Sequence, residues 1–304
     1  MATTPHFDVS VIIVNYHSLD DVNDCIKSIL EQTTSSLSFE VIIVSNSEEQ
    51  EQDIDIIKSI HKDITYFSTG ENAGFAKANN IGANIARGEY LFILNPDTLL
   101  LNDVLGLFYK KMESAPPIGL IAPCMYNQNL EPYPSVIGDI KISSLISLAI
   151  PFGALLFYPP NRHKFYLPKQ SGAVDVVQGS ALFLSSQLYS DVKGMGEEFF
   201  MYSEERDLCL KVRKAGYSVF YYQKAKVKHI GGTSTSKSFL KMEVQKHRSK
   251  KIFIKKYYPN LIFLNRLCGS FGYFWRFITA LITLKKKKFK QFGTLFKWYL
   301  LTYK

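Results

Sequence analysis

The sequence has little cysteine, and its cysteines follow no pattern. The four cysteines in 304 residues are scattered, with neither a paired nor a metal-ligand spacing. This excludes a small disulfide-stabilised domain and a cysteine-bound metal centre, and it is typical of a protein in a reducing cytoplasm. The first residues also lack a basic region followed by an apolar stretch, so we expect no export signal.

Long apolar runs without charge or proline are absent as well. Residues 267–284 are long enough to be considered as a membrane span, but they contain Arg276 and several glycines. Residues 142–158 contain Pro151 and lie in the middle of the chain, and we interpret them as an insertion. Neither segment is predicted to cross a membrane.

Acidic residues are scarce after position 235. Residues 236–304 contain 17 lysines and arginines but one acid, Glu243, whereas the preceding residues carry more acids than bases. The chain is therefore an acidic body with a basic tail. Nucleic acid binding is disfavoured, because no recognition module accompanies the basic segment. A solvated basic face, with its aromatic residues docked on the body, is one alternative.

The end of the tail has the pattern of an amphipathic helix. Aromatic residues recur there every three or four positions and lysines every seven, so a helix would separate them onto different faces. We predict that this helix binds an anionic membrane surface, which would place the protein at the inner face of the cytoplasmic membrane. The residues are Phe289, Phe292, Phe296 and Tyr299, with Lys290, Lys297 and Lys304.

Strand and helix patterns alternate along the body. This βαβ alternation predicts an α/β fold with a mostly parallel, doubly wound sheet and helices on both faces. The chain is long enough, and with 46% hydrophobic residues apolar enough, to bury one large core. The expected strands are residues 9–15, 39–45, 64–67 and 90–94, and the expected helices are residues 20–31, 54–61 and 75–87, the last ended by Gly88.

Two stretches carry residues suited to chemistry. An apolar run at residues 90–94 is stopped by Pro96, so Asp97 follows a buried strand at the edge where open α/β sheets bind ligands. Residues 199–208 place three acids at the start of a helix, and His229 follows a later strand. Carboxylates and a histidine are the groups that a metal-assisted transfer needs.

Several motifs share their order and spacing with one family. The chain resembles glycosyltransferase family 2, which has the GT-A fold, and within it the bacterial rhamnosyltransferase-like branch that builds cell-surface polysaccharides. The resemblance covers about residues 8–236. The motifs are residues 9–16, residues 71–80, Asn95-Pro96-Asp97-Thr98, Gln178-Gly179-Ser180, residues 204–208 and residues 214–217.

The resemblance implies a domain organisation and a reaction. Residues 1–235 would form the catalytic domain, with a nucleotide-sugar half at about 1–122 and an acceptor half at about 123–235, and residues 236–304 would form a membrane-associating tail. We expect an inverting, metal-dependent enzyme that transfers a sugar to a lipid-linked or growing glycan. The leading expectation for the sugar is L-rhamnose, supplied by dTDP-rhamnose. The alternatives are another hexose or deoxyhexose from a UDP or GDP donor, a catalytically silent sugar-nucleotide-binding subunit, and a glycosidase.

The resemblance also implies roles for the acids and the histidine. Asp97 and His229 would bind Mg²⁺ or Mn²⁺, and Glu205 would be the catalytic base, while Glu204 and Asp207 would orient the acceptor or the helix. Structural interpretations remain open: Asp97 as a turn cap, His229 as a hydrogen-bonded residue at a strand end, and the acids as partners of the helix dipole behind a Ser203 N-cap.

The remaining motif residues are expected to bind the nucleotide sugar. The family usually has an aspartate where this chain has Ser45, and that acid hydrogen-bonds the pyrimidine ring, so the identity of the base stays open. Asn95 replaces the first acid of the family's Asp-x-Asp motif and can offer only a neutral contact. The expected contacts are Asn15, Tyr16, Ser45, Asn72, Gly74, Asn79, Asn95, Asp97 and Gly179.

Overall fold

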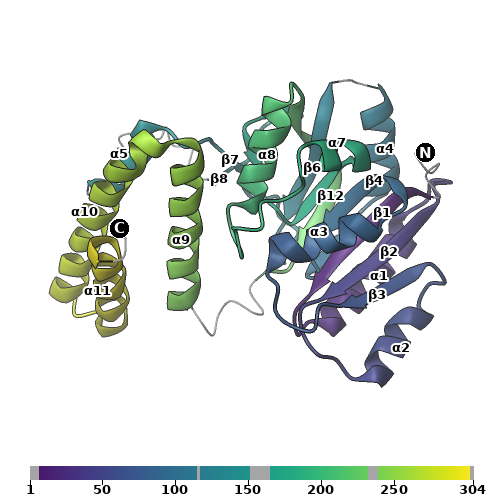
Figure 1. Cartoon of the computed structure of the whole chain (residues 1–304), viewed down its shortest axis with the longest axis horizontal. Helices are drawn as coiled ribbons and strands as arrows, with labels where there is room; N and C mark the ends of the chain where they lie inside the picture. The colour runs from purple at the N-terminus through teal and green to yellow at the C-terminus, as the bar shows by residue number, and fades with distance from the viewer. Residues whose placement is uncertain (1–6, 115–116, 151–164, 232–238, 302–304) are drawn as a thin grey trace. The chain divides into compact units, whose positions relative to one another are not determined.

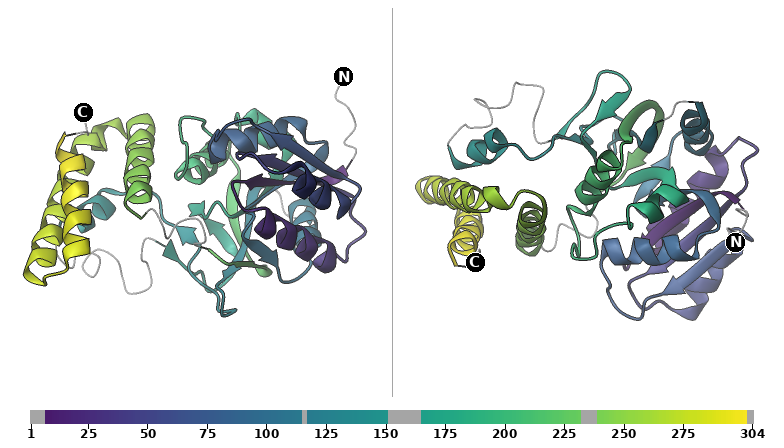
Figure 2. Two further views of the ribbon diagram at one scale, coloured as in Figure 1. Left: turned by 90° about the horizontal axis from the view of Figure 1, so that it is seen from below. Right: turned by 45° about the horizontal axis from the view of Figure 1, so that its top comes forward.

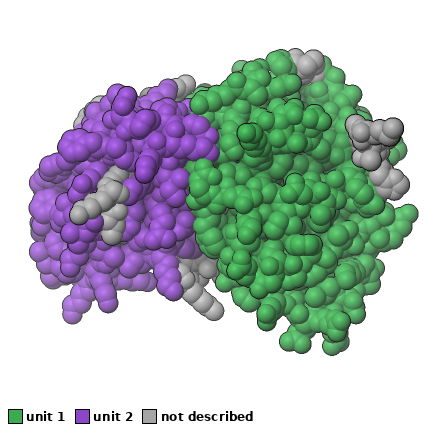
Figure 3. Space-filling model, viewed as in Figure 1, with its two compact units in different colours: residues 1–137, 167–233 green, residues 138–166, 234–304 purple. Residues whose placement is uncertain are grey.

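The computed structural model describes residues 7–114, 117–150, 165–231 and 239–301. The chain forms two compact units (Figure 3): residues 1–137 with 167–233, and residues 138–166 with 234–304. The predicted tail therefore shares its unit with residues 138–166, which the sequence analysis groups with the catalytic domain. Lys304 and residues 151–158 of the apolar stretch lie outside the described residues.

Four parallel strands form one half of the sheet in the first unit, in the order β3-β2-β1-β4 (Figure 1). The chain runs outward from β1 to β3 and then returns to place β4 beside β1, so the strand order reverses between β1 and β4. Ligands of open α/β sheets bind at such a reversal. The elements are β1 (Phe7–Asn15), α1 (Leu19–Gln32), β2 (Phe39–Ser45), α2 (Glu51–Ser59), β3 (Ile64–Ser68), α3 (Phe75–Ile85) and β4 (Gly88–Leu94).

Helices α1 and α3 cover opposite faces of this parallel half (Figures 1 and 2). Val11 and Ile13 of β1 pack with Ile29 of α1, whereas Val14 packs with Ala78 of α3. Successive side chains of a strand point to opposite faces, so these contacts place one helix on each side. The predicted α/β fold with helices on both faces is confirmed.

The other half of the sheet is mixed. Strand β11 lies antiparallel between β4 and β6, and β12 runs parallel to β6 but antiparallel to β5 and β9. The elements of this half are β5 (Thr98–Leu100), α4 (Val104–Ser114), β6 (Ile118–Tyr126), β9 (Gly172–Val174), β11 (Ala181–Ser185), α7 (Ser186–Asp191), α8 (Glu204–Lys214) and β12 (Ser218–His229). Strands β7 (Val136–Ile137) and β10 (Val176–Val177) pair antiparallel with each other in a separate small sheet.

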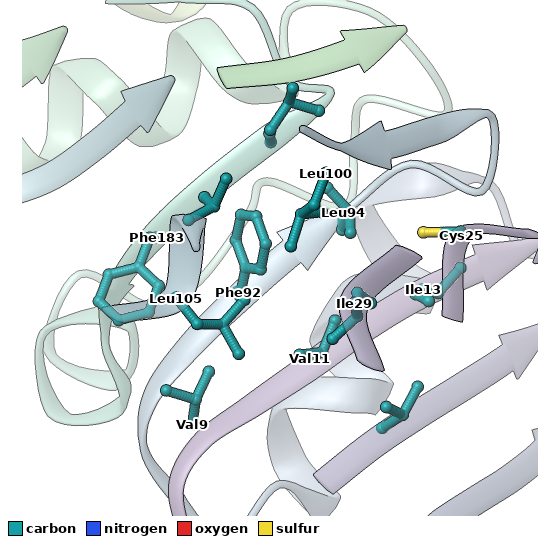
Figure 4. Close-up of a cluster of buried hydrophobic side chains, with 14 of the residues drawn as sticks. Val9, Val11, Ile13, Cys25, Ile29, Phe92, Leu94, Leu100, Leu105 and Phe183 are labelled. Atoms are coloured by element: carbon teal, nitrogen blue, oxygen red, sulfur yellow. The ribbon is translucent and has the colours of Figure 1, made fainter. Parts of the chain in front are cut away.

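Aromatic rings join the two halves of the sheet in the core (Figure 4). Phe92 of β4 is fully buried, with its ring centroid 5.8 Å from that of Phe108 on α4 and 6.1 Å from that of Phe183 on β11. Such buried, interlocked rings hold the two halves as one body, which keeps the strand ends that carry the candidate site in fixed positions.

Gly88 is the first residue of β4. The prediction that it ends the preceding helix is wrong. Helix α3 ends at Ile85, and the backbone N–H of Gly88 donates to Oγ of Ser10 over 2.8 Å. A Cβ atom at Gly88 would collide with the backbone nitrogen of Ser10. The glycine therefore allows the close approach of β4 to β1.

The second unit is helical apart from the short β8. Leu145 of α5 is buried in one hydrophobic cluster with Ile254 of α9 and Cys268 of α10, which explains why residues 138–166 group with the tail. Among the described residues no helix is long and apolar enough to cross a membrane. The elements are α5 (Ile142–Ala149), β8 (Phe165–Tyr166), α9 (Phe239–Tyr257), η2 (Pro259–Leu261), α10 (Ile262–Ile282) and α11 (Lys286–Leu301).

Helix α11 separates lysines from aromatic residues as predicted, and its aromatic face packs on a neighbouring helix. Tyr299 is fully buried, the ring of Phe289 lies 4.4 Å from that of Phe277, and the ring of Phe296 lies 5.5 Å from that of Phe274. These contacts are with α10, and binding of this face to a membrane stays a prediction. Apolar pairing between neighbouring helices accounts for the same periodicity.

Helix α10 has an exposed apolar stripe of its own. Phe263, Phe271, Trp275 and Ile282 are between 44% and 74% exposed and recur at helical spacing along one side. The lysine run 285–288 follows directly and is also exposed. This stripe and the lysine run together form the α10 stripe discussed below.

Candidate active site

Asp97 and His229 meet because β5 pairs with β12. In this antiparallel pair His229 lies opposite Thr98, and the backbone N–H of Ile230 donates to the carbonyl of Asp97 over 2.9 Å. The pairing brings Oδ1 of Asp97 to 3.2 Å from Nε2 of His229. The carboxylate and the imidazole therefore form one polar pair at the carboxyl edge of the sheet.

The environment of Asp97 favours its charged form. Burial raises the pKa of this carboxyl, but the hydrogen bond and the charge of His229 lower it by more, with help from the backbone of Gly231. The net pKa lies below the ordinary value, so Asp97 is a carboxylate at neutral pH. Both side chains remain partly accessible, at 14% for His229 and 17% for Asp97, so a ligand can reach them.

Tyr133 holds the other side of the imidazole, and the sequence analysis missed it. Its hydroxyl lies 2.8 Å from Nδ1 of His229 and 3.4 Å from Oε1 of Gln178. Burial raises the pKa of Tyr133 to about 12, so it stays a neutral phenol. A single tyrosine in a proline-rich segment gives no sequence signal of this role.

A pocket of about 500 Å³ opens beside His229. Amide side chains and backbone groups dominate its wall, so it can hydrogen-bond a hydroxyl-rich ligand. Its lining residues are Asn127, Gln128, Asn129, Tyr133, Gln178, His229, Ile230 and Gly231.

The donor set at this edge fits a divalent cation that shares its ligands with substrate. Within the described residues no cluster of three or more His, Cys, Asp or Glu side chains could hold a metal, and Asp97 and His229 are the pair that these residues bring together at this edge. Mg²⁺ is commonly bound by one or two carboxylates together with substrate phosphates and water. The buried Oδ1 of Asn95, a neutral oxygen in the same turn as Asp97, has no hydrogen-bond partner in the described part of the chain.

The three acids of α8 have different surroundings. Asp207 is fully buried, accepts from the backbone of Gly196 over 3.2 Å and forms a 2.8 Å ion pair with Lys211, so it fixes the helix. Glu204 is 6% exposed, and burial, followed by the charge of Glu205, raises its pKa well above the usual range. Glu204 is therefore the member of the pair that keeps its proton.

Glu205 is partly exposed and lies beside Gly179. A Cβ atom at Gly179 would be 3.2 Å from Cβ of Glu205, so the glycine makes room for this side chain. Gln178 of the same motif contacts Tyr133, which links the surroundings of Glu205 to those of His229. Ser203 occupies the predicted N-cap position, in a left-handed conformation with φ of 73°, but its side chain makes no capping hydrogen bond.

The loop before α8 is docked on α3. The backbone N–H of Phe75 donates to the carbonyl of Phe200 over 2.9 Å, and a Cβ at Gly74 would lie 2.6 Å from that carbonyl oxygen. Gly74 has φ of 83°, so two requirements favour glycine there. The contact ties the start of α3 to the loop that precedes Glu205.

The predicted nucleotide-binding residues divide into two groups. Asn15 and Ser45 lie together at the ends of β1 and β2, 2.8 Å apart from Nδ2 to Oγ, and Tyr16 beside them is 46% exposed. Asn72 is exposed and accepts from the backbone of Gly74. Asn79, in contrast, is fully buried, and its amide nitrogen donates to the carbonyl of Phe75 within α3.

Comparisons with known proteins agree with this geometry. Residues 10–164 match the family described as Glycosyl transferase family 2. Relatives include the Low-salt glycan biosynthesis hexosyltransferase Agl10 of Haloferax volcanii, 27% identical over 219 residues, or 70% of this chain and 64% of the relative. The Rhamnosyltransferase WbbL of Escherichia coli is 26% identical over 234 residues, or 70% of this chain and 80% of the relative.

A solved structure shares the fold. The crystal structure of GalNAc-T7 with UDP, GalNAc and Mn²⁺ matches with a TM-score of 0.57 and 13% identity, over 82% of this chain and 50% of that chain. The likeness shows a GT-A-like fold. The chain thus spans just under two thirds of the length of the Haloferax relative and half of the GalNAc-T7 chain.

Proposed function

The chain belongs to glycosyltransferase family 2, and we propose that it is an inverting, metal-dependent enzyme that transfers a sugar from a nucleoside diphosphate to a glycan acceptor. The observation that carries the proposal is the pair of Asp97 and His229 at the carboxyl edge of the sheet, with their polar atoms 3.2 Å apart. A divalent cation can neutralise an anionic diphosphate at such an edge, and a carboxylate beside an imidazole can bind that cation.

Asp97 and His229 would hold the divalent cation, Mg²⁺ or Mn²⁺. When bound, such an ion neutralises charge on the leaving diphosphate. For Nε2 of His229 to act as a ligand, Nδ1 must carry the ring proton and donate it to the oxygen of Tyr133, 2.8 Å away. Tyr133 can then donate its own proton to Oε1 of Gln178. Asn95 would contribute a neutral oxygen.

Glu205 would act as the catalytic base. The acceptor hydroxyl must lose its proton as the new glycosidic bond forms, and a positioned base accelerates such a step by about 10²- to 10⁴-fold. Glu204 is the less suitable candidate, because burial raises its pKa and favours the protonated form. A base that activates an external hydroxyl, with no covalent intermediate on the enzyme, gives inversion.

We propose L-rhamnose from dTDP-rhamnose as the donor, with another hexose or deoxyhexose as the second candidate. The similarity to the Rhamnosyltransferase WbbL supports the first, and the similarity to the hexosyltransferase Agl10 supports the broader class. The proposed acceptor is a lipid-linked or growing glycan of a surface polysaccharide. The amide-lined pocket beside His229 suits a ligand rich in hydroxyl groups.

We also propose that the protein attaches to the inner face of the cytoplasmic membrane through the α10 stripe. Exposed rings such as those of Phe271 and Trp275 can enter a lipid interface, and the lysines at 285–288 can approach anionic headgroups, each contributing on the order of 1 kcal/mol. The aromatic face of α11 packs against α10, so this proposal uses the exposed α10 stripe instead.

Release of nucleoside diphosphate from dTDP-, UDP- and GDP-linked sugars tests the function, since water can replace the acceptor hydroxyl. We expect one donor class to be cleaved with Mn²⁺ or Mg²⁺ and to be protected by EDTA. Binding of a donor without cleavage or transfer would instead favour a silent binding subunit. Cleavage of a glycan that EDTA does not affect would favour a glycosidase.

A further inference from the structure

The chain lacks the acid expected at the end of β2 but supplies a carboxylate to the same place from the following loop. Ser45 stands where the family usually has an aspartate. Oε1 of Glu49 nevertheless lies 2.8 Å from Nδ2 of Asn15 and 2.6 Å from Oγ of Ser47. Asn15 also donates to Oγ of Ser45, so the carboxylate of Glu49 and the hydroxyl of Ser45 share one amide group.

Two hydrogen bonds to Oε1, from groups that are themselves held in place, fix the orientation of this carboxylate. Oδ1 of Asn15 accepts from the backbone N–H of Ser18 over 3.0 Å, which leaves the amide nitrogen of Asn15 to donate towards Glu49. The hydroxyl of Ser47 accepts from the backbone N–H of His17 over 2.9 Å and donates to Glu49. Asn15 is fully buried and Ser47 is 9% exposed, so the holding groups belong to the protein interior.

One oxygen of Glu49 remains available. Both of its hydrogen bonds end on Oε1, and the described residues provide none to Oε2. The side chain is partly exposed, and Tyr16 presents an exposed ring at the end of the neighbouring strand β1. A planar ligand can stack on such a ring while its edge meets a carboxylate.

We propose that Glu49 reads the base of the donor nucleotide by accepting a hydrogen bond from a ring N–H. This proposal rests on the proposed function. Uracil, thymine and guanine carry a ring N–H at their pairing edge, whereas cytosine and adenine carry a lone pair there, which a carboxylate repels. Hydrogen bonds to an ionised acceptor are about twice as strong as neutral ones, and an unpaired carboxylate disfavours the wrong base.

Binding of dTDP, UDP, GDP, CDP and ADP in the presence of Mn²⁺, measured by isothermal titration calorimetry, tests the proposal. UDP and CDP are a matched pair that differ at the pairing edge of the base. We expect the wild-type protein to prefer UDP over CDP by at least about tenfold, the scale on which a site penalises a ligand that leaves a polar group unpaired.

Glu49→Gln is the informative variant, because an amide can both donate and accept. It should weaken UDP binding and reduce the preference for UDP over CDP to about threefold or less. Glu48→Gln removes the same charge from the exposed neighbouring residue and should change neither affinity nor preference. Thermal melting of both variants controls for folding. Glu49→Ala, which removes the carboxylate and shortens the side chain, is a second variant for the same measurement.

The outcomes separate the two proposals. Binding by the wild-type protein with an unchanged preference in Glu49→Gln would overturn the role of Glu49 and leave the proposed function intact. A wild-type preference for CDP and ADP would also overturn the role of Glu49. Failure of the wild-type protein to bind any of these nucleotides, dTDP included, would overturn the proposed function as well.

Discussion

The hydroxyl of Tyr133 lies 2.8 Å from Nδ1 of His229, on the side of the imidazole opposite to Asp97, which lies 3.2 Å from Nε2. The histidine is therefore held at both nitrogens. Because the two nitrogens cannot change roles independently, Tyr133 determines which nitrogen of His229 is available to a cation.

Tyr133→Phe should weaken metal-dependent nucleotide binding without unfolding the protein. Loss of a hydrogen-bond partner behind a metal-binding histidine typically costs 10- to 100-fold in affinity, and we expect about tenfold here. The measurement is a titration of Mn²⁺ at a fixed concentration of nucleoside diphosphate. Tyr217→Phe removes a hydroxyl from a tyrosine that is 42% exposed and should have no effect. Equal Mn²⁺ affinity in both variants would remove Tyr133 from the site.

Glu205→Gln should bind the donor normally but transfer sugar at least about 10²-fold more slowly, because the variant lacks the base. Steady-state rates and donor affinities measured on the same preparation separate these effects. Glu204→Gln should retain far more activity, since the Glu204 carboxyl is buried and its pKa is raised. The base would be reassigned to Glu204 if the Gln variant at 204 lost activity while that at 205 kept it.

Glu204 should make the protein less stable as the pH rises. Its pKa is raised in the folded state, chiefly by burial, so the folded protein binds a proton that the unfolded chain releases above about pH 4. The free energy of unfolding therefore falls as the pH rises from that value through the folded-state pKa. Glu204→Gln should remove this loss and be more stable than wild type at pH 8, by on the order of 1 kcal/mol, but not at pH 4.

Thermal denaturation at several pH values measures this effect, with Glu31→Gln as the control at an exposed acid of α1. An identical pH dependence of stability in wild type and Glu204→Gln would show that Glu204 is not the buried acid described above.

The α10 stripe should hold the protein on anionic vesicles. Reversing the charge of two lysines, with Lys286→Glu and Lys287→Glu, should lower the affinity for the vesicles by at least about tenfold in cosedimentation. Each cation near the surface contributes on the order of 1 kcal/mol. Lys58→Glu with Lys62→Glu makes the same change of charge at exposed sites of the first unit and should have little effect.

Substituting the apolar part of the stripe separates the two contributions. Trp275→Ser should weaken binding even at high salt, where the charge contribution is screened. Deleting α11 is a poor test, because Leu295 and Tyr299 are buried and their loss would expose the inner face of α10. If the Lys286→Glu and Lys287→Glu double variant sediments with the vesicles as wild type and the control variant do, the α10 stripe does not bind membranes.

Periodicity and strand-end position predicted much of the fold and part of the site. Apolar runs identified β1, β2 and β4, and the proline after β4 marked Asp97 as a strand-end residue. The contact of Asp97 with His229 depends on the antiparallel pairing of β5 with β12, which local pattern does not reveal. Tyr133 reaches His229 from a segment without a motif.

Two other features depend on tertiary packing. Glu49 reaches Asn15 from the loop after β2, four residues beyond the position that the family motif indicates. The aromatic residues of α11 have the same periodicity whether they face lipid or a neighbouring helix, and only the contact of Tyr299 with α10 distinguishes the two. The periodicity of apolar residues in a sequence identifies the apolar face of a helix, but it does not identify what packs on that face.

The central claim is that Asp97 helps to hold a divalent cation against the diphosphate of the donor. Calorimetric titration of UDP and dTDP with and without Mn²⁺, on wild type, Asp97→Ala and the exposed control Asp24→Ala, tests it most directly. We predict that Mn²⁺ tightens binding at least about tenfold in wild type and Asp24→Ala but leaves Asp97→Ala unchanged. An equal Mn²⁺ effect in Asp97→Ala and wild type would contradict the account.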